Sequence, residues 1–478
     1  MVSLPAAAGT GRKLGAAGRP AGRGRHCLFQ EHPDEMRDPL AHAGLRLAAA
    51  LFLCGPVVAS PAAPPAALTP SGAERAGTAD GRIPAWSGGI ARPPPGWEPS
   101  QGHTDPFAGE TPLAMIERAN MDEHAAHLSP GLQALLRQRK GFRMPLYPSH
   151  RTFAVPGHVH AATEAGAGRA AVEDKRLRGH RQPGIPFPQP RSGEEAMFNH
   201  LQRWIGGVSA CSDWLPIRAS GDYFRVGWCS KIVQASEMDA LETAQDGTYF
   251  LGRYDAPTAL LGTIYLVHEP LDSAAGERRA WIYNSGQRRV RRAPDLAFDN
   301  VADGSEGMAT IDDGGGFNGS LERYDWKLVG KRELYVPYNA YRLASPALRY
   351  DEMIEGNLIR PELMRYELHR VWVVEATLAP GMSHIYARRT FYLDEDSWQV
   401  VIAEAWDGHG ELWRVSLLPL IQLYDVPNMV PRAQMIHDLR SGSLLVTGLD
   451  NERPRPAMQW HQKGRLAEFR PAALRAMH

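Results

Sequence analysis

From about Ser209 onward, apolar and polar residues alternate with a period of two, which is the spacing of side chains on the two faces of a β-strand. Short runs of turn residues separate these alternating stretches, so we expect a mainly antiparallel sheet. The predicted strands are Gly262–Glu269, Arg279–Tyr283, Arg288–Arg292, Tyr324–Gly330, Tyr366–Leu378, His384–Leu393, Trp398–Trp406, Glu411–Tyr424 and Ser443–Leu449.

Helical patterns precede this region, which makes the expected fold mainly β with some helix (α+β). One helix is predicted over Leu113–His127, and a second begins behind Ser129 and ends before Gly141. The strongest helix signal is the capping box Ser192–Glu195, where a serine and a glutamate three residues apart satisfy the first free backbone N–H groups. The stretches 61–102 and 143–191 are rich in proline and glycine, and we expect irregular structure there.

The N-terminal residues are typical of an export signal. Residues 1–35 are rich in glycine, alanine and arginine and precede Met36, where we expect translation to start. From there Arg37 and Arg46 precede the apolar run Leu47–Val58 and a small-residue cleavage site, so residues 36–60 are predicted to be a signal peptide. Lipid attachment at Cys54 is the weaker alternative. No later apolar stretch is long enough to span a bilayer.

The expected organisation of the chain follows from these boundaries. Residues 61–191 are predicted to be an extended segment with two short helices that packs on the main domain, which covers residues 192–455 and is followed by a tail, 456–478. The 53 basic and 53 acidic residues give a formal net charge of zero, which argues against nucleic acid as a partner.

Two of the four cysteines, Cys211 and Cys229, lie in the expected mature chain. Because an exported protein meets an oxidising compartment, we predict a disulfide between them. His158 and His160 lie two residues apart and could face one side of an extended segment, but two histidines without a third ligand make a poor metal site. We therefore expect no metal.

The chain carries no nucleophile elbow, phosphate-binding loop or zinc-peptidase motif, so no enzyme class and no cofactor is indicated. An enzyme acting on a hydrophobic substrate stays an alternative, with His268, Glu269 and His369 as acid or base if they converge in one cavity.

Large aromatic residues recur in the predicted strands. They can fill a core or line an apolar cavity, and both interpretations stay open. The candidate ligand-binding residues are Trp281, Tyr283, Trp326, Trp372, Trp398, Trp406 and Trp413.

An arginine-rich strand follows an aromatic one between Trp281 and Pro294. Alternation places Trp281 and Tyr283 on one face, and Arg288 and Arg292 on the same face as Val290. Four guanidinium groups cannot all be buried without partners, so we expect this strand near a sheet edge, near carboxylates or near an anionic ligand. It is either a solvated strand or a contact for lipid headgroups, a membrane surface or a transport partner. The arginines are Arg288, Arg289, Arg291 and Arg292.

Several longer segments have the character of family motifs: Leu68–Gly77, Asp80–Gly89, Met144–Arg151, Gly184–Pro188, Trp281–Asn284, Gln287–Pro294, Arg323–Lys331, Tyr366–Glu375 and Phe391–Trp398. Together they resemble a family of exported proteobacterial proteins of unknown function (domain of unknown function 1329), often labelled outer-membrane lipoprotein-sorting proteins, with a fold like the carrier LolA.

This resemblance implies an incomplete antiparallel β-barrel covered by helices, whose apolar interior holds acyl chains. It supplies no proven ligand. The leading hypothesis is a periplasmic carrier of a lipid or another hydrophobic molecule, or an accessory protein of outer-membrane lipid or lipoprotein trafficking, because strands with apolar residues on both faces and abundant aromatic residues occur in an exported chain without a catalytic motif. A partner protein of an outer-membrane transporter, without a ligand, is the alternative. The family supplies no catalytic residue.

Overall fold

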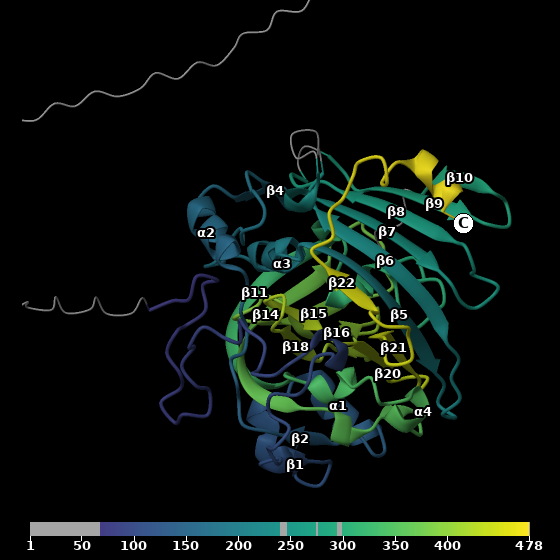
Figure 1. Cartoon of the computed structure of the whole chain (residues 1–478). Coiled ribbons are helices and arrows are strands. Elements are labelled where there is room, and N and C mark those ends of the chain that lie inside the picture. Colours follow the sequence, from purple (N-terminus) through teal and green to yellow (C-terminus); the bar gives the residue numbers. More distant parts are fainter. Residues whose placement is uncertain (1–66, 240–245, 274–275, 294–298, 478) are drawn as a thin grey trace, which may run out of the picture. The chain divides into compact units, whose positions relative to one another are not determined.

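A computed structural model describes residues 67–239, 246–273, 276–293 and 299–477. These described residues belong to one compact unit (Figure 1). The predicted signal peptide and the expected start at Met36 lie outside the described residues.

The dominant element is a sheet of sixteen strands. Along its main path the order is β1-β2-β14-β15-β16-β17-β20-β21-β5-β6-β7-β8-β9-β10, while β11 pairs with β14 and β22 pairs with β5. The bounds are β1 Ala114–Ile116, β2 Met144–Leu146, β5 Gly207–Ile217, β6 Val226–Gln234, β7 Thr248–Tyr254, β8 Ile264–Glu269, β9 Arg279–Asn284, β10 Arg289–Arg292, β11 Tyr324–Pro337, β14 Tyr366–Leu378, β15 Arg388–Asp394, β16 Val400–Trp406, β17 Leu412–Leu417, β20 Gln434–Asp438, β21 Leu444–Leu449 and β22 Met458–Trp460.

Shorter elements complete the described chain. Three two-stranded sheets pair β3 Ala171–Glu173 with β4 Arg176–Arg178, β12 Ile354–Glu355 with β13 Leu358–Ile359, and β18 Leu420–Leu423 with β19 Asn428–Pro431. The α-helices are α1 Pro130–Gln138, α2 Gly157–Gly166, α3 Gly193–Gln202 and α4 Tyr350–Met353, and 3-10 helices include η2 Met121–His127, η5 Ile311–Gly316 and η9 Pro471–Ala476.

The predicted mainly β class is confirmed, but the sheet does not close into a barrel among the described residues. Its path ends at β1 on one side and β10 on the other, with no pairing between them. The sheet is also mixed rather than purely antiparallel, because Leu146 of β2 pairs in parallel with Tyr366 of β14. α3 contacts β11 and β14, and α1 contacts β17 (Figure 1).

Most predicted strands are present, and their differences have local causes. β14 has the predicted bounds, Tyr366–Leu378. The predicted strand Glu411–Tyr424 divides into β17 and β18, because Pro419 between them has no backbone N–H to donate to a neighbouring strand. β11 continues seven residues past the predicted end at Gly330, across an irregularity in its pairing with β14 between Leu328 and Gly330.

The helix predictions had mixed outcomes. Ser129 caps α1 by accepting a hydrogen bond from the backbone of Leu132, and Ser192 caps α3 in the same way, as their sequences predict. The helix predicted over Leu113–His127 is wrong, since this stretch forms β1, which pairs with β2, and then the 3-10 helix η2. Helix α2 lies in a stretch predicted to be irregular.

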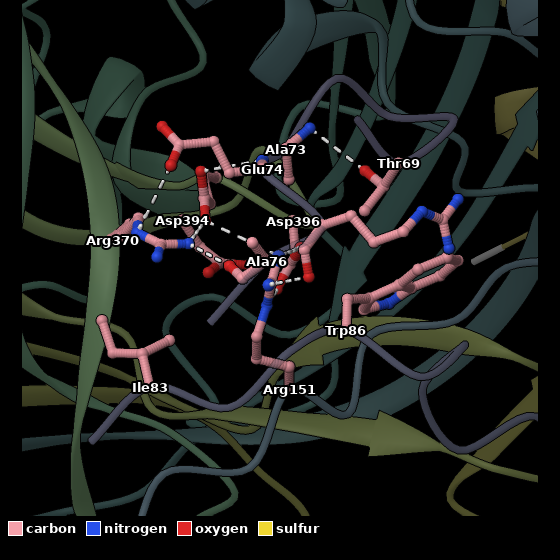
Figure 2. A network of polar contacts seen from close by, with 12 residues as sticks. Thr69, Ala73, Glu74, Ala76, Ile83, Trp86, Arg151, Arg370, Asp394 and Asp396 are labelled. Atoms are coloured by element: carbon pink, nitrogen blue, oxygen red, sulfur yellow. Dashed lines mark hydrogen bonds and ion pairs between the residues drawn. The ribbon is translucent and has the colours of Figure 1, made fainter. Parts of the chain in front are cut away.

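A buried polar network anchors the segment around residues 69–86 to the turn between β15 and β16 (Figure 2). Arg370 donates to the carbonyl oxygen of Ala76 at 2.9 Å, and the Trp398 indole donates to the carbonyl oxygen of Ser71 at 2.9 Å. The Arg75 guanidinium lies 4.9 Å from the ring centroid of Trp86. Three of the segments that carry the family resemblance, which lie far apart in the sequence, therefore meet at this point of the fold.

Candidate functional site

An open pocket of about 310 Å³ lies on one face of strands β5–β8. We call this side the pocket face. One row of four side chains crosses the floor of the pocket. The four residues occupy directly opposed positions on the successive antiparallel strands β5, β6, β7 and β8, so their side chains point to the same face. The row is Cys211, Cys229, Arg253 and Ile264.

The C-terminal part of the chain forms the wall of the pocket. Pro456, Ala457 and Gln459 lie at or beside β22, and Met477 follows η9. The backbone N–H of Cys211 donates to the carbonyl oxygen of Ala457 at 2.8 Å, which holds this segment against β5. In Figure 1 the C-terminal segment, coloured yellow, crosses this half of the sheet.

The predicted disulfide between Cys211 and Cys229 is confirmed. The two residues are directly opposite each other on β5 and β6, with an S–S distance of 2.04 Å and a Cα–Cα distance of 4.0 Å. The disulfide lies in the pocket floor.

The charged residues that line the pocket are Lys231 and Arg253, and both are cations. The ammonium group of Lys231 lies 2.7 Å from the carboxylate of Glu468, which also accepts from Arg465 at 2.8 Å. Partial burial acts to raise the pKa of Glu468, but the hydrogen bonds from Lys231 and Arg465 lower it overall. Arg253 is exposed and donates to the carbonyl oxygen of Met477 at 3.3 Å.

The seven aromatic residues proposed from the sequence are distributed over separate parts of the fold, and none lines this pocket. Trp326, Trp372 and Trp398 pack in a core cluster that includes residues of α3. Trp281 and Tyr283 pack in another cluster, with Phe469 and Leu474 of the C-terminal segment. Trp406 lies under the guanidinium of Arg388 at 3.9 Å, and Trp413 donates to Asp438 at 2.9 Å.

A different set of aromatic residues lies on the opposite side of strands β5–β8, which we call the aromatic face. The Trp228 and Tyr254 rings lie 4.6 Å apart, and Trp228 and Phe250 are half-buried. Gly252 makes this packing possible, because a Cβ atom there would lie 2.1 Å from the Trp228 ring. This cluster was not predicted from the sequence, because β5, β6 and β7 were not assigned as strands. The buried residues of β6 lie at its two ends and do not alternate along it. Its rings are Trp214, Phe224, Trp228, Phe250, Tyr254 and Tyr265.

The arginine strand lies at the end of the sheet path, as expected for so many cations. Arg288 precedes β10 in a turn with a φ of 51°, so it does not share the face of Val290 as the strict alternation predicts. Val290 is half-buried against the cluster under the C-terminal segment. All four arginines are exposed, and within the described chain no ion pair to them is present. They are Arg288, Arg289, Arg291 and Arg292.

The titratable residues considered for an enzyme lie in two places. His268 lies 2.7 Å from the carbonyl oxygen of Phe469, and burial lowers its pKa. Glu269 is paired with Arg278, and burial raises the pKa of Glu269. His369 lies in β14, where it contacts Glu367 at 3.0 Å inside the core. Each histidine therefore has its own structural partners.

His158 and His160 lie in α2 rather than in an extended segment. In a helix, residues two positions apart do not face the same side. Among the described residues no group of three or more His, Cys, Asp or Glu side chains could hold a metal ion. None of the helices in the described ranges is long and apolar enough to cross a membrane.

The fold and pocket define a mainly β protein with a large open sheet and a ligand-sized pocket beside a disulfide. A family model described as "protein of unknown function (DUF1329)" matches residues 115–475. An uncharacterised protein of Pseudomonas aeruginosa is 39% identical over 419 residues, which cover 85% of this chain and 91% of that protein. The chain belongs to the DUF1329 family, and the resemblance seen in the sequence is confirmed.

Solved structures to which the chain is similar include a putative outer membrane lipoprotein-sorting protein domain from Vibrio parahaemolyticus, with a TM-score of 0.39, 15% identity and coverage of 56% of this chain and 92% of that one. A DUF1329 family protein from Desulfovibrio piger gives a TM-score of 0.38, 17% identity and coverage of 56% and 92%. A LolA superfamily protein from Nitrosomonas europaea gives 0.35, 11% identity and coverage of 59% and 98%.

Proposed function

We propose that this protein binds a lipid or another molecule with an acyl chain in the pocket over β5–β8, as a periplasmic carrier or accessory protein of outer-membrane lipid trafficking. The observation that carries the proposal is the pocket of about 310 Å³, a volume at the lower end of small-molecule sites. Leu251, Ile264 and Met477 contribute apolar side chains to its lining. Each methylene group buried there would contribute about 0.8 kcal/mol.

The expected compartment is supported by two independent features. The disulfide between Cys211 and Cys229 is typical of proteins that leave the reducing cytosol. Residues 36–60 have the charge and hydrophobicity pattern of a signal peptide. Both features agree with export to the periplasm.

The test is native mass spectrometry of the mature protein purified from a periplasmic fraction, followed by organic extraction and lipid analysis. A stoichiometric bound lipid is the expected result, and an empty protein that takes up no fluorescent fatty acid would refute the proposal. The variant Leu251→Trp places a large ring in the pocket and is expected to abolish uptake. Val267→Trp is the matched control, since Val267 is half-buried on the aromatic face of the neighbouring strand.

A role in docking is the second candidate, and the exposed arginine strand favours it. Four guanidinium groups at a sheet edge suit anionic headgroups or an acidic surface of an outer-membrane transporter. In that case the arginines contact the donor or acceptor of the ligand, while the pocket holds its apolar part. If the purified protein carries no lipid and takes up no fatty acid, we would instead propose a docking role without a ligand.

A further inference from the structure

We infer that the pocket over β5–β8 selects a single acyl chain that ends in a carboxylate, with Arg253 and Lys231 as the groups that bind the carboxylate. This inference rests on the proposed function and names the ligand class for the same pocket. Neutral lipids and two-chain phospholipids are the alternatives that it excludes.

The first support is the sign of the charge. Of the residues that line the pocket, two are charged, Lys231 and Arg253, and none is acidic. Burying a carboxylate is costly unless cations or hydrogen-bond donors compensate it, and a neutral oxygen forms weaker hydrogen bonds with cations than a carboxylate does. The lining is therefore cationic, and the two carboxylates beside it already have cationic partners, Glu468 in Lys231 and Asp255 in Arg453.

The second support is the geometry of the two cations. Arg253 on β7 is directly opposite Cys229 on β6, and Lys231 lies two positions further along β6 on the same face. Such diagonal neighbours on antiparallel strands are about 7–8 Å apart, within reach of long side chains. One carboxylate can thus accept hydrogen bonds from both residues.

The third support is that only one of the two cations, Lys231, has a carboxylate partner among the described residues. Glu468 neutralises Lys231, but within the described ranges no carboxylate forms an ion pair with Arg253. Arg253 contacts instead the carbonyl oxygen of Met477 at 3.3 Å. Arg253 is thus the cation available to a ligand, and Glu468 competes with the ligand for Lys231.

The size of the pocket restricts the apolar part of the ligand. A volume of about 310 Å³ is close to the minimum for small-molecule sites. It suits one chain and leaves no room for a second. The apolar lining residues accept the chain next to the disulfide, while the exposed guanidinium of Arg253, which rises from the floor row between Cys229 and Ile264, accepts the head group.

The experiment compares dodecanoate with dodecanol on the full mature chain by displacement of a fluorescent probe. We expect dodecanoate to bind at least tenfold more tightly than dodecanol, and the preference to decrease as salt is added. Arg253→Gln should reduce dodecanoate affinity about tenfold, the value of one charged hydrogen bond, without changing dodecanol affinity. Glu468→Gln should increase dodecanoate affinity, because it releases Lys231.

Arg291→Gln is the matched control, because Arg291 is also exposed but lies on the edge strand β10 outside the pocket lining. It should leave both affinities unchanged. Equal binding of dodecanol and dodecanoate would overturn the inferred carboxylate selectivity while leaving the proposed hydrophobic site intact. If neither dodecanoate nor dodecanol binds, the proposed function is refuted together with the inference.

Discussion

The guanidinium of Arg151 forms a two-point pair with the carboxylate of Asp396, with Nε–Oδ2 and Nη2–Oδ1 distances of 2.8 and 2.6 Å. The exposed fractions of the two side chains are 2% and 1%. Arg151 also donates to the carbonyl oxygen of Arg75 at 3.4 Å, so the pair connects the sheet to the segment near the start of the described chain (Figure 2).

Breaking this pair should strongly destabilise the protein. Asp396→Asn leaves the buried Arg151 with Glu395 at 3.6 Å as its remaining acidic partner. We expect a loss of about 3 kcal/mol in the free energy of unfolding, measured by urea denaturation. Asp80→Asn is the control, since it breaks an exposed, solvent-screened pair with Arg82 and should change the free energy of unfolding far less than Asp396→Asn does. Equal effects of the two variants would contradict the role of burial.

Glu404 should make stability dependent on pH. Burial raises its pKa from 4.5 to about 7, although the backbone of Gly131 and the Tyr392 hydroxyl donate to its carboxylate. Because the folded protein holds this proton more tightly than the unfolded chain, the stabilisation is complete below about pH 4.5 and is lost as the pH rises to about 7. Between pH 4.5 and pH 8 the free energy of unfolding should therefore decrease by about 3 kcal/mol because of Glu404, and Glu404→Gln should abolish this part of the decrease. Urea unfolding at the two pH values measures it. Parallel pH profiles for the two proteins would contradict the prediction.

Removal of the disulfide between Cys211 and Cys229 should lower the free energy of unfolding. Cys211 and Cys229 are 18 residues apart, and closing a loop of this length restricts the unfolded chain by about 3 kcal/mol. The double variant Cys211→Ser/Cys229→Ser should show this loss in chemical denaturation, and adding reductant to the natural protein should reproduce it. Alkylation of both thiols before reduction would show that the disulfide does not form.

The arginine strand should matter for docking but not for stability. Replacing all four arginines by glutamine should change the free energy of unfolding by less than about 0.5 kcal/mol per site, because the side chains are exposed. Binding to vesicles with anionic phospholipid should be lost, and binding of the natural protein should weaken with salt. The variant is Arg288→Gln/Arg289→Gln/Arg291→Gln/Arg292→Gln.

The control for that experiment replaces four other exposed arginines, remote in sequence from β10. If it reduces vesicle binding equally, the effect is one of total charge and the strand has no special role. The control residues are Arg118, Arg169, Arg181 and Arg470.

Local patterns predicted much of the secondary structure. The alternation from Tyr366 to Leu378 identified β14, and the caps at Ser129 and Ser192 identified the starts of α1 and α3. These predictions were correct because they depend on neighbours a few residues away. The stretch from Leu113 to His127 was assigned wrongly because its β1 part forms only by pairing with β2, some thirty residues later.

In the candidate site, too, the features that depend on residue type could be predicted, and those that depend on long-range packing could not. The disulfide could be predicted, because only Cys211 and Cys229 remained in the expected mature chain. The tryptophans could not be assigned to one site, because strand pairing and the covering segments decide which ring meets which neighbour. Trp398 is buried in the core cluster that includes residues of α3, while Trp228 is half-buried on the aromatic face of strands β5–β8.

By itself, the sequence determined the mainly β class, the family, the cysteine pair and the two helix starts, since each depends on residue type and short spacing. Only the tertiary structure decided where a ligand-sized space lies. The pocket exists because residues near 457 and 477 cross strands that begin near residue 207, a contact between positions more than 200 residues apart. Such long-range packing depends on how the whole chain buries its apolar surface, and no local pattern records it.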